Sequence, residues 1–127
     1  MNGYTRMLAA AAVLLLTGPM EARAADEVRH ISGGASAEAR EELRAQEPEF
    51  NLKIVVAEKS GDYLADVKIA IGSARNQTVI EDKMLGPILL AKLPPGTYTI
   101  RAVYEDKELT QTVAVPARGL RQVDFRW

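Results

Sequence analysis

Residues 93–104, LPPGTYTIRAVY, limit what this chain can fold into more than any other stretch. The dense Pro94-Pro95-Gly96 group predicts a turn, because proline fixes φ and glycine admits positive φ. The residues that follow alternate with a period of two, which is typical of a strand. One face of this strand then holds Tyr98, Ile100, Ala102 and Tyr104. A second β-rich run at 109–115, after a polar turn at 105–107, completes a predicted β-hairpin.

Five more segments alternate in the same way or are rich in β-branched residues. They are 51–57, 63–71, 78–84, 88–93 and 120–127. Together with the hairpin they predict seven short strands at even spacing, which is typical of an antiparallel β-sandwich. We expect one face of each sheet to meet the core and the other to meet water.

The N-terminus has the pattern of a secretory signal peptide. Arg6 precedes an apolar run over residues 7–16, which is too short to cross a bilayer as a helix, since that needs ~20 residues. Ala22-Arg23-Ala24 fits the small-x-small cleavage rule. We therefore predict a signal peptide over residues 1–24 and a periplasmic or secreted protein without a membrane span after cleavage. An uncleaved anchor is the alternative.

Charge and cysteine content exclude several classes of protein. Cleavage would remove Arg6, Arg23 and Glu21 and leave a net charge of about −2, which does not favour nucleic acid or an anionic membrane surface. The chain contains no cysteine, so it has neither disulfides nor a lipoprotein attachment site. The fold must depend on packing alone.

Residues 25–49 are expected to lie outside the sandwich domain, which we assign to 50–127. Residues 26–34 are polar and predict a flexible lead-in, whereas 37–47 are rich in helix formers behind a Ser36 N-cap. Pro48 should end this helix. We interpret it as a solvated cap over one sandwich edge, with a docking helix as the alternative, and expect the sandwich to fold without 25–47.

The hairpin resembles that of a known family. Residues 93–100, followed by Thr112-Val113-Ala114-Val115, are similar to the L-P-x-G-x-Y-x-hydrophobic hairpin of prealbumin-like domains, as found in the carboxypeptidase regulatory-like family. Residues 61–67 resemble the second strand of those domains. The resemblance covers about 50–127 and implies a transthyretin-like seven-stranded sandwich with an accessory or ligand-contacting role.

Related hydrolases of the urate pathway share that fold but use several histidines and a C-terminal Tyr-Arg-Gly-Ser. This chain has one histidine and ends in Asp-Phe-Arg-Trp, so that activity does not transfer. His30 falls in the expected lead-in and is interpreted as solvated, and structural zinc would need about four N or S ligands. We therefore expect no catalytic, metal-binding or cofactor-binding residues and no cofactor.

Carboxylates gather at two predicted turns, Glu58, Asp62 and Asp66 at one, and Glu105, Asp106 and Glu108 at the other. A pair Glu81-Asp82 falls on the third strand. None has the spacing of a calcium loop, so solvated turns are the simpler interpretation. A small hydrolase using Glu58, Asp62 and Asp66 is the alternative.

Aromatic side chains and turn tips supply the candidate contacts with a partner. Tyr98 and Phe125 are in phase with the core, whereas the candidates lie near strand ends or turns, namely Tyr63, Gly86, Pro87, Tyr104 and Trp127. The sequence thus favours a non-catalytic exported module that binds a protein or cell-envelope component, or has a structural role. A sugar- or peptide-binding module remains a further alternative, and would need an aromatic-lined pocket.

Overall fold

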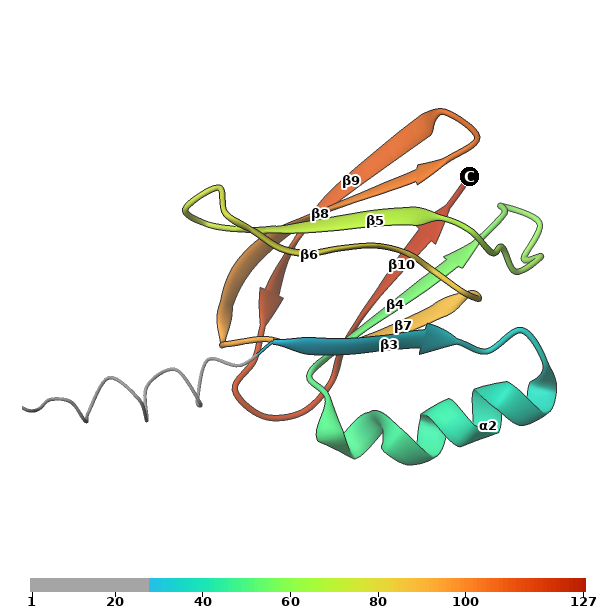
Figure 1. Ribbon diagram of the computed structural model, residues 1–127, viewed down its shortest axis with the longest axis horizontal. Coiled ribbons are helices and arrows are strands. Elements are labelled where there is room, and N and C mark those ends of the chain that lie inside the picture. Colours follow the sequence, from blue (N-terminus) through green and yellow to red (C-terminus); the bar gives the residue numbers. More distant parts are fainter. Residues whose placement is uncertain (1–27) are drawn as a thin grey trace, which may run out of the picture.

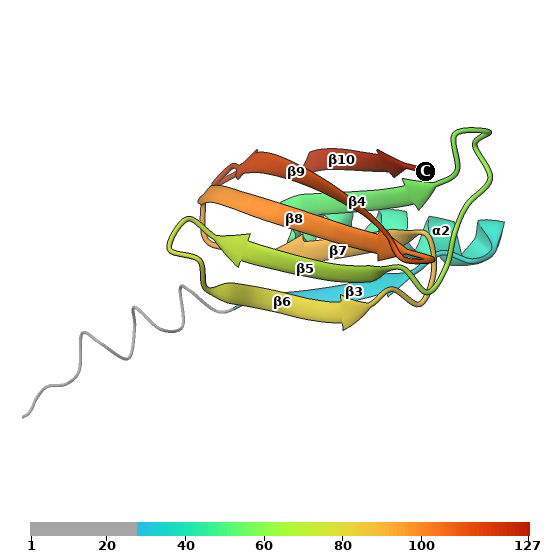
Figure 2. The same ribbon diagram turned by 90° about the horizontal axis from the view of Figure 1, so that it is seen from above.

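The computed structural model describes residues 28–127, which form an all-β sandwich with one α-helix. One sheet, named here the covered sheet, has the strand order β10 (Arg121–Arg126), β4 (Leu52–Ala57), β7 (Ile88–Lys92) and β3 (Arg29–Gly33). The other, the bare sheet, has the order β6 (Thr78–Lys83), β5 (Lys68–Ser73), β8 (Gly96–Tyr104) and β9 (Lys107–Val115). Figure 1 shows the helix outside the covered sheet, and Figure 2 shows the bare sheet's strands side by side.

The sheets contain eight strands within the described residues, and not the seven that the sequence predicts. The additional strand is β3, where we expected a flexible lead-in. It pairs antiparallel with β7 from Arg29 opposite Lys92 to Gly33 opposite Ile88. Because Ile31 is its only large apolar residue, alternation gives no signal for it. The sandwich therefore begins before residue 50. The predicted signal peptide lies outside the described residues.

One pair of strands is parallel, which corrects the prediction of a fully antiparallel sandwich. β10 runs alongside β4 in the same direction, from Arg121 opposite Leu52 to Arg126 opposite Ala57. A parallel pair needs a long connection, and here the chain builds the bare sheet and β7 between the two strands. Alternation of side chains carries no information on strand direction, so the sequence pattern could not show this.

The central hairpin is confirmed, since β8 and β9 pair from Gly96 opposite Val115 to Tyr104 opposite Lys107. Only Glu105 and Asp106 form the turn, and both have positive φ, 50° and 66°. Two consecutive left-handed residues match the twist of the strands that they join, as in a type I′ turn.

The strand predicted at 63–71 is shorter than expected. β5 begins at Lys68, because Asp66 has a φ of 62° and interrupts the extended chain. Before this break, Tyr63 forms only an isolated bridge to Ala57 and is 53% exposed, whereas Leu64 is buried. The alternation that buries Ile69 and Ile71 in β5 therefore does not extend to Tyr63, which has the same parity in the sequence but is exposed.

The main core lies between the two sheets, where alternate residues of each strand point inward. Ile54 and Phe125 of the covered sheet and Ile69 and Ile100 of the bare sheet are almost fully buried in it. Removal of such apolar surface from water is the dominant favourable contribution to folding.

A second apolar cluster lies on the outer face of the covered sheet, beneath α2 (Ala37–Gln46) and the short 3-10 helix η2 (Glu47–Glu49). The helix begins as predicted, with the Ser36 Oγ accepting a hydrogen bond from the Ala39 N–H at 3.1 Å. The cluster consists of Leu43, Phe50, Val55, Ile88 and Leu90, with Ile31 and Leu120 packed against it. The helix thus covers a sheet face, and our interpretation of it as a cap over an edge is wrong.

A buried asparagine joins three segments at one end of the covered sheet. Asn51 is 2% exposed, and its Nδ2 donates to the carbonyls of Leu93 at 2.7 Å and Pro116 at 3.1 Å. Its Oδ1 accepts from the Leu93 N–H at 3.0 Å. A buried amide needs such partners, so Asn51 fixes the start of β4 to the chain after β7 and after β9.

Candidate functional site

Two of the five predicted contact residues are buried. A Cβ on Gly86 would lie 2.4 Å from the carbonyl oxygen of Gly33, so the connection from β6 to β7 passes closely over the end of β3. Pro87 is also buried, and its carbonyl accepts a hydrogen bond from the Val56 N–H at 2.9 Å. These two residues are therefore packing elements and offer no surface to a partner.

Tyr104 and Trp127 lie together at one end of the sandwich. Their rings meet edge to face with centroids 6.0 Å apart, and both side chains are half-buried. The Trp127 Nε1 donates to the Lys107 carbonyl at 3.0 Å, and its ring centroid lies 6.1 Å from that of Phe125. This pair closes the end of the core and exposes only part of each ring.

The carboxylates of two turns approach Tyr104 from different parts of the chain. The negative charge of Glu105 raises the pKa of the Tyr104 phenol most, followed by partial burial and then by Glu58 and Asp66. Asp62 points elsewhere, with its carboxylate accepting from the Ser60 hydroxyl at 3.2 Å. Within residues 28–127 no three His, Asp or Glu side chains are grouped to hold a metal ion.

His30 is not a solvated lead-in residue. Its Nε2 lies 2.9 Å from the Asp82 Oδ2, which joins β3 at the edge of the covered sheet to β6 at the edge of the bare sheet. This hydrogen bond is the main reason that the pKa of Asp82 is lowered, with the Lys83 N–H second. At the opposite edge, the Gln111 Nε2 donates to the Asp124 carbonyl at 2.7 Å.

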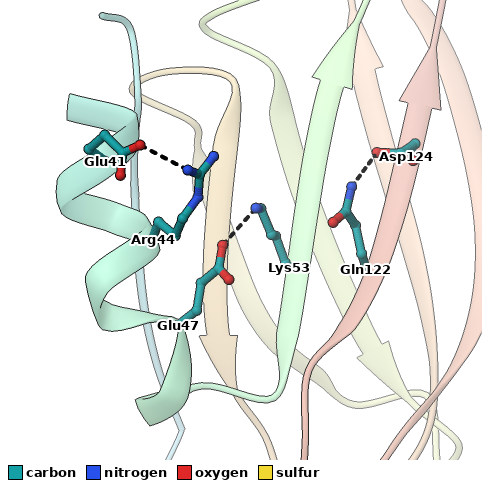
Figure 3. Close-up of polar contacts among 6 residues, drawn as sticks. All are labelled: Glu41, Arg44, Glu47, Lys53, Gln122 and Asp124. Atoms are coloured by element: carbon teal, nitrogen blue, oxygen red, sulfur yellow. Dashed lines mark hydrogen bonds and ion pairs between the residues drawn. The ribbon is translucent and has the colours of Figure 1, made fainter. Parts of the chain in front are cut away.

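A groove runs between α2 and β10 because the helix covers only part of the covered sheet. We name it the helix groove, with a volume of about 240 Å³. Its floor is Lys53 and Val55 of β4 with Ile88 of β7. Its walls and end are Arg40, Arg44, Tyr63, Gln122, Asp124 and Arg126. Figure 3 shows how α2 and β10 face each other across Lys53.

The charges of the helix groove are unequal. Four cationic side chains line it, Arg40, Arg44, Lys53 and Arg126, against the carboxylate of Asp124 and two more beside the groove, Glu41 paired with Arg44 and Glu47 paired with Lys53. The chain as a whole has a net charge of −1, so this excess of positive charge is local to the groove. Such a site attracts an anionic group to one place on a protein that does not attract anions overall.

Lys53 is held by a carboxylate at the floor of the groove. Its Nζ lies 2.7 Å from the Glu47 Oε2, and the side chains are only 16% and 23% exposed (Figure 3). Arg44 pairs with Glu41 at 2.8 Å, but both side chains are about two-thirds exposed, at 65% and 67%. Exposed pairs of this kind contribute little to stability, so Arg44 can exchange Glu41 for another anion at small cost.

The other two arginines, Arg40 and Arg126, have N–H donors that no described residue uses. The Arg40 Nη1 donates to the Gly34 carbonyl at 3.0 Å, and its Cζ lies 4.9 Å from the centre of the Tyr63 ring. Cation–π stacking of this kind leaves the other N–H groups of the guanidinium free to bind. The Arg126 side chain is exposed and makes no hydrogen bond or ion pair with any other described residue.

The bare sheet has a larger hollow of about 410 Å³ on its outer face, floored by Ala70. Its charged residues are three cations and three carboxylates, namely Lys68, Lys83, Arg101, Glu81, Asp82 and Glu108. Equal numbers of opposite charges give this hollow no preference for one sign of ligand. The helix groove is therefore the stronger candidate for a binding site.

Of the predicted contact residues, only Tyr63 lines the helix groove, and the sequence did not identify the arginines around it. The sequence contained a weak signal for this surface. Arg40 and Arg44 are spaced by four and so share one face of the helix, and Gln122, Asp124 and Arg126 alternate and so share one face of the last strand. Neither pattern shows that the two surfaces face each other.

The sequence matches no family model, and a comparison with curated proteins finds no match. Among the described residues, no helix is both long and apolar enough to cross a membrane.

Proposed function

We propose that the protein is a non-catalytic exported β-sandwich module that binds another protein of the cell envelope through the helix groove. The observation that supports this most is that Arg40 and Arg126, on opposite walls of the groove, pair with no carboxylate of the described residues, in a chain with negative net charge. From the signal peptide predicted over residues 1–24, we propose that this role is in the periplasm or outside the cell.

The resemblance of residues 93–100 to the hairpin of prealbumin-like domains agrees with this proposal. Domains of the carboxypeptidase regulatory-like family are often accessory modules, and we propose that this chain is one of that kind. The eight-stranded arrangement with a parallel pair is then a variant of the expected seven-stranded sandwich.

The alternative functions have less support. A solute-binding module would need a concave pocket lined by aromatic rings, and five surface hollows of the described residues contain at most one aromatic side chain each. A hydrolase using Glu58, Asp62 and Asp66 would need these carboxylates in a shared cleft, and none of the three lines any of those five hollows.

Photo-crosslinking in living cells tests the proposal. Benzoylphenylalanine replaces Gln122 in the helix groove in one variant and Thr112 on the outer face of the bare sheet in the control, and both positions are exposed. We expect ultraviolet light to give an adduct of higher mass from position 122 and little or none from position 112. Equal adducts from both positions, or none from either, would contradict the proposal.

A further inference from the structure

We infer that the partner inserts an extended segment into the helix groove in which acidic residues alternate with apolar ones. This inference depends on the proposed function and names the chemistry of the partner. It follows from the type of cation, the apolar floor, the length of the groove and the position of its one carboxylate.

The cations available to a ligand are guanidinium groups on opposite walls. Arg40 and Arg44 come from α2, and Arg126 comes from β10, whereas Lys53 is already paired with Glu47. The planar fork of a guanidinium donates two parallel hydrogen bonds to one carboxylate. Arginines on both walls therefore suit a ligand with several carboxylates spaced along it.

The groove also offers apolar contacts that a simple polyanion would not use. Val55 and Ile88 form part of its floor, where the 8% and 6% of each residue that remains exposed faces the groove. Tyr63, at one end of the groove, is 53% exposed, and the Arg40 guanidinium stacks on its ring. Exposed aromatic side chains that are held in place are favoured anchors in protein interfaces.

The shape of the surface favours an extended segment over a compact ligand. A second hollow of about 240 Å³ shares Arg44 with the helix groove and is lined by Pro48, Phe50, Gly119, Leu120 and Glu47, whose carboxylate is paired with Lys53. The two hollows together follow the length of β10 past Arg44. An extended chain advances about 3.3 Å per residue, so several residues are needed to span them.

Asp124 disfavours a uniform polyanion as the ligand of the groove. Its carboxylate lies in the groove with the Gln122 Nε2 3.1 Å from its Oδ1, on the same strand as Arg126. A ligand with a negative charge at every position would meet Asp124 with like charge, which is unfavourable. A segment with neutral residues between its carboxylates avoids this contact.

Fluorescence anisotropy with a synthetic peptide tests the inference. The probe is a labelled, end-blocked peptide that repeats Glu-Ser-Glu-Leu, and the reference peptide has Lys in place of every Glu. At low ionic strength we expect the purified protein to bind the Glu peptide and not the Lys peptide. Inorganic polyphosphate should compete poorly.

Two matched charge reversals locate the binding. Arg126→Glu changes an exposed arginine of the helix groove, and Arg101→Glu changes an exposed arginine on the outer face of the bare sheet. We expect Arg126→Glu to weaken binding of the Glu peptide by about tenfold or more, and Arg101→Glu to weaken it by less than about twofold. Thermal melting of both variants shows whether they remain folded. If Arg126→Glu does not fold, Arg126→Gln replaces it, and we expect a smaller loss of affinity from that variant.

The outcomes separate this inference from the proposed function. If the Glu peptide does not bind while crosslinking at position 122 persists, the partner is not acidic and only this inference fails. If polyphosphate competes better than the Glu peptide, the groove is a polyanion site and the inference also fails. Equal losses from both charge reversals would indicate non-specific attraction and would contradict it.

Discussion

The outer faces of the two sheets differ in what covers them. On the covered sheet, Leu90 and Val55 point outward into an apolar cluster beneath α2. On the bare sheet, the corresponding outward positions of central strands hold Ala70, Thr99 and Arg101, which no helix of the described chain covers (Figure 2). β4 and β7 are therefore buried on both faces, whereas β5 and β8 alternate between core and solvent.

This difference indicates where the protein can recognise a partner. The hollows on the exposed face of the bare sheet are lined by residues of its own strands and turns, and no helix forms a wall for them. A helix that covers only part of a sheet face creates a step, and the helix groove lies along that step between α2 and β10 (Figure 3). The same packing that stabilises the covered sheet thus produces the concave surface with the cationic lining.

The largest expected effect on stability comes from removing α2 and β3 from the covered sheet. A chain that begins at Pro48 lacks β3 and α2, which exposes Phe50, Val55 and Leu90 and removes one of the two partner strands of β7. We expect it to lose its cooperative thermal transition, as measured by circular dichroism. Had the helix only capped an edge, as the sequence suggested, the truncated chain would keep a sharp transition close to that of the whole protein.

Single substitutions on the two faces sharpen the comparison. Leu90→Ala on the outer face of β7 should cost about 2–5 kcal/mol in the free energy of unfolding, because it leaves a cavity beneath the helix. Ile100→Ala in the main core should cost a similar amount. Thr99→Ala on the outer face of β8 should cost less than about 0.5 kcal/mol.

Urea unfolding of the three variants measures these values. A small cost for Leu90→Ala together with a large cost for Thr99→Ala would reverse the assignment of covered and bare sheets.

A somewhat smaller effect is expected at the end of the covered sheet. Asn51→Ala removes the hydrogen bonds to Leu93 and Pro116 and leaves their buried groups unsatisfied, which should cost about 2–3 kcal/mol. Gln122→Ala, at an exposed polar position, is the control and should cost less than about 0.5 kcal/mol. Equal unfolding midpoints in urea for Asn51→Ala and the wild type would show that Asn51 does not join these segments.

The smallest expected effect on stability comes from the contact between His30 of β3 and Asp82 of β6, and it depends on pH. The pKa of Asp82 is lower in the folded protein, so the folded state binds fewer protons at this group than the unfolded state does. The resulting stability is present above the usual pKa of aspartate, about 4, and is lost as the pH falls through the lower, folded value.

We therefore expect Asp82→Asn to flatten the decrease in the unfolding midpoint below about pH 5, whereas the control Asp62→Asn leaves that slope close to wild type. Urea melts at a series of pH values measure it. An unchanged slope in Asp82→Asn would mean that the contact with His30 does not persist in solution.

The sequence predicted those parts of the fold whose signal is local. The alternation of Tyr98, Ile100 and Ala102 identified the inward face of β8, and Ser36 identified the start of the helix, because both depend on neighbouring residues alone. Leu43 is the one buried residue of α2, and a single large apolar residue among alanines did not suggest that the helix packs on a sheet face.

The parts that the sequence did not predict depend on contacts between distant segments. β3 is a strand because β7 offers it an edge, and the direction of β10 is set by its pairing with β4. The helix groove combines Arg40 with Arg126, which are far apart in the chain and meet only after both α2 and β10 have packed. The buried positions of Gly86 and Pro87 follow in the same way from the close approach of β3.

The central claim is that the step between α2 and β10, and not the outer face of the bare sheet, is the binding surface. Backbone amide shifts of the isotope-labelled protein, recorded while the Glu-Ser-Glu-Leu peptide is added, test this claim most directly. The account predicts that the largest changes occur at Arg40, Tyr63, Gln122 and Arg126, with β5 and β8 unchanged. Changes centred on Lys68, Ala70 and Arg101, or no changes at all, would contradict it.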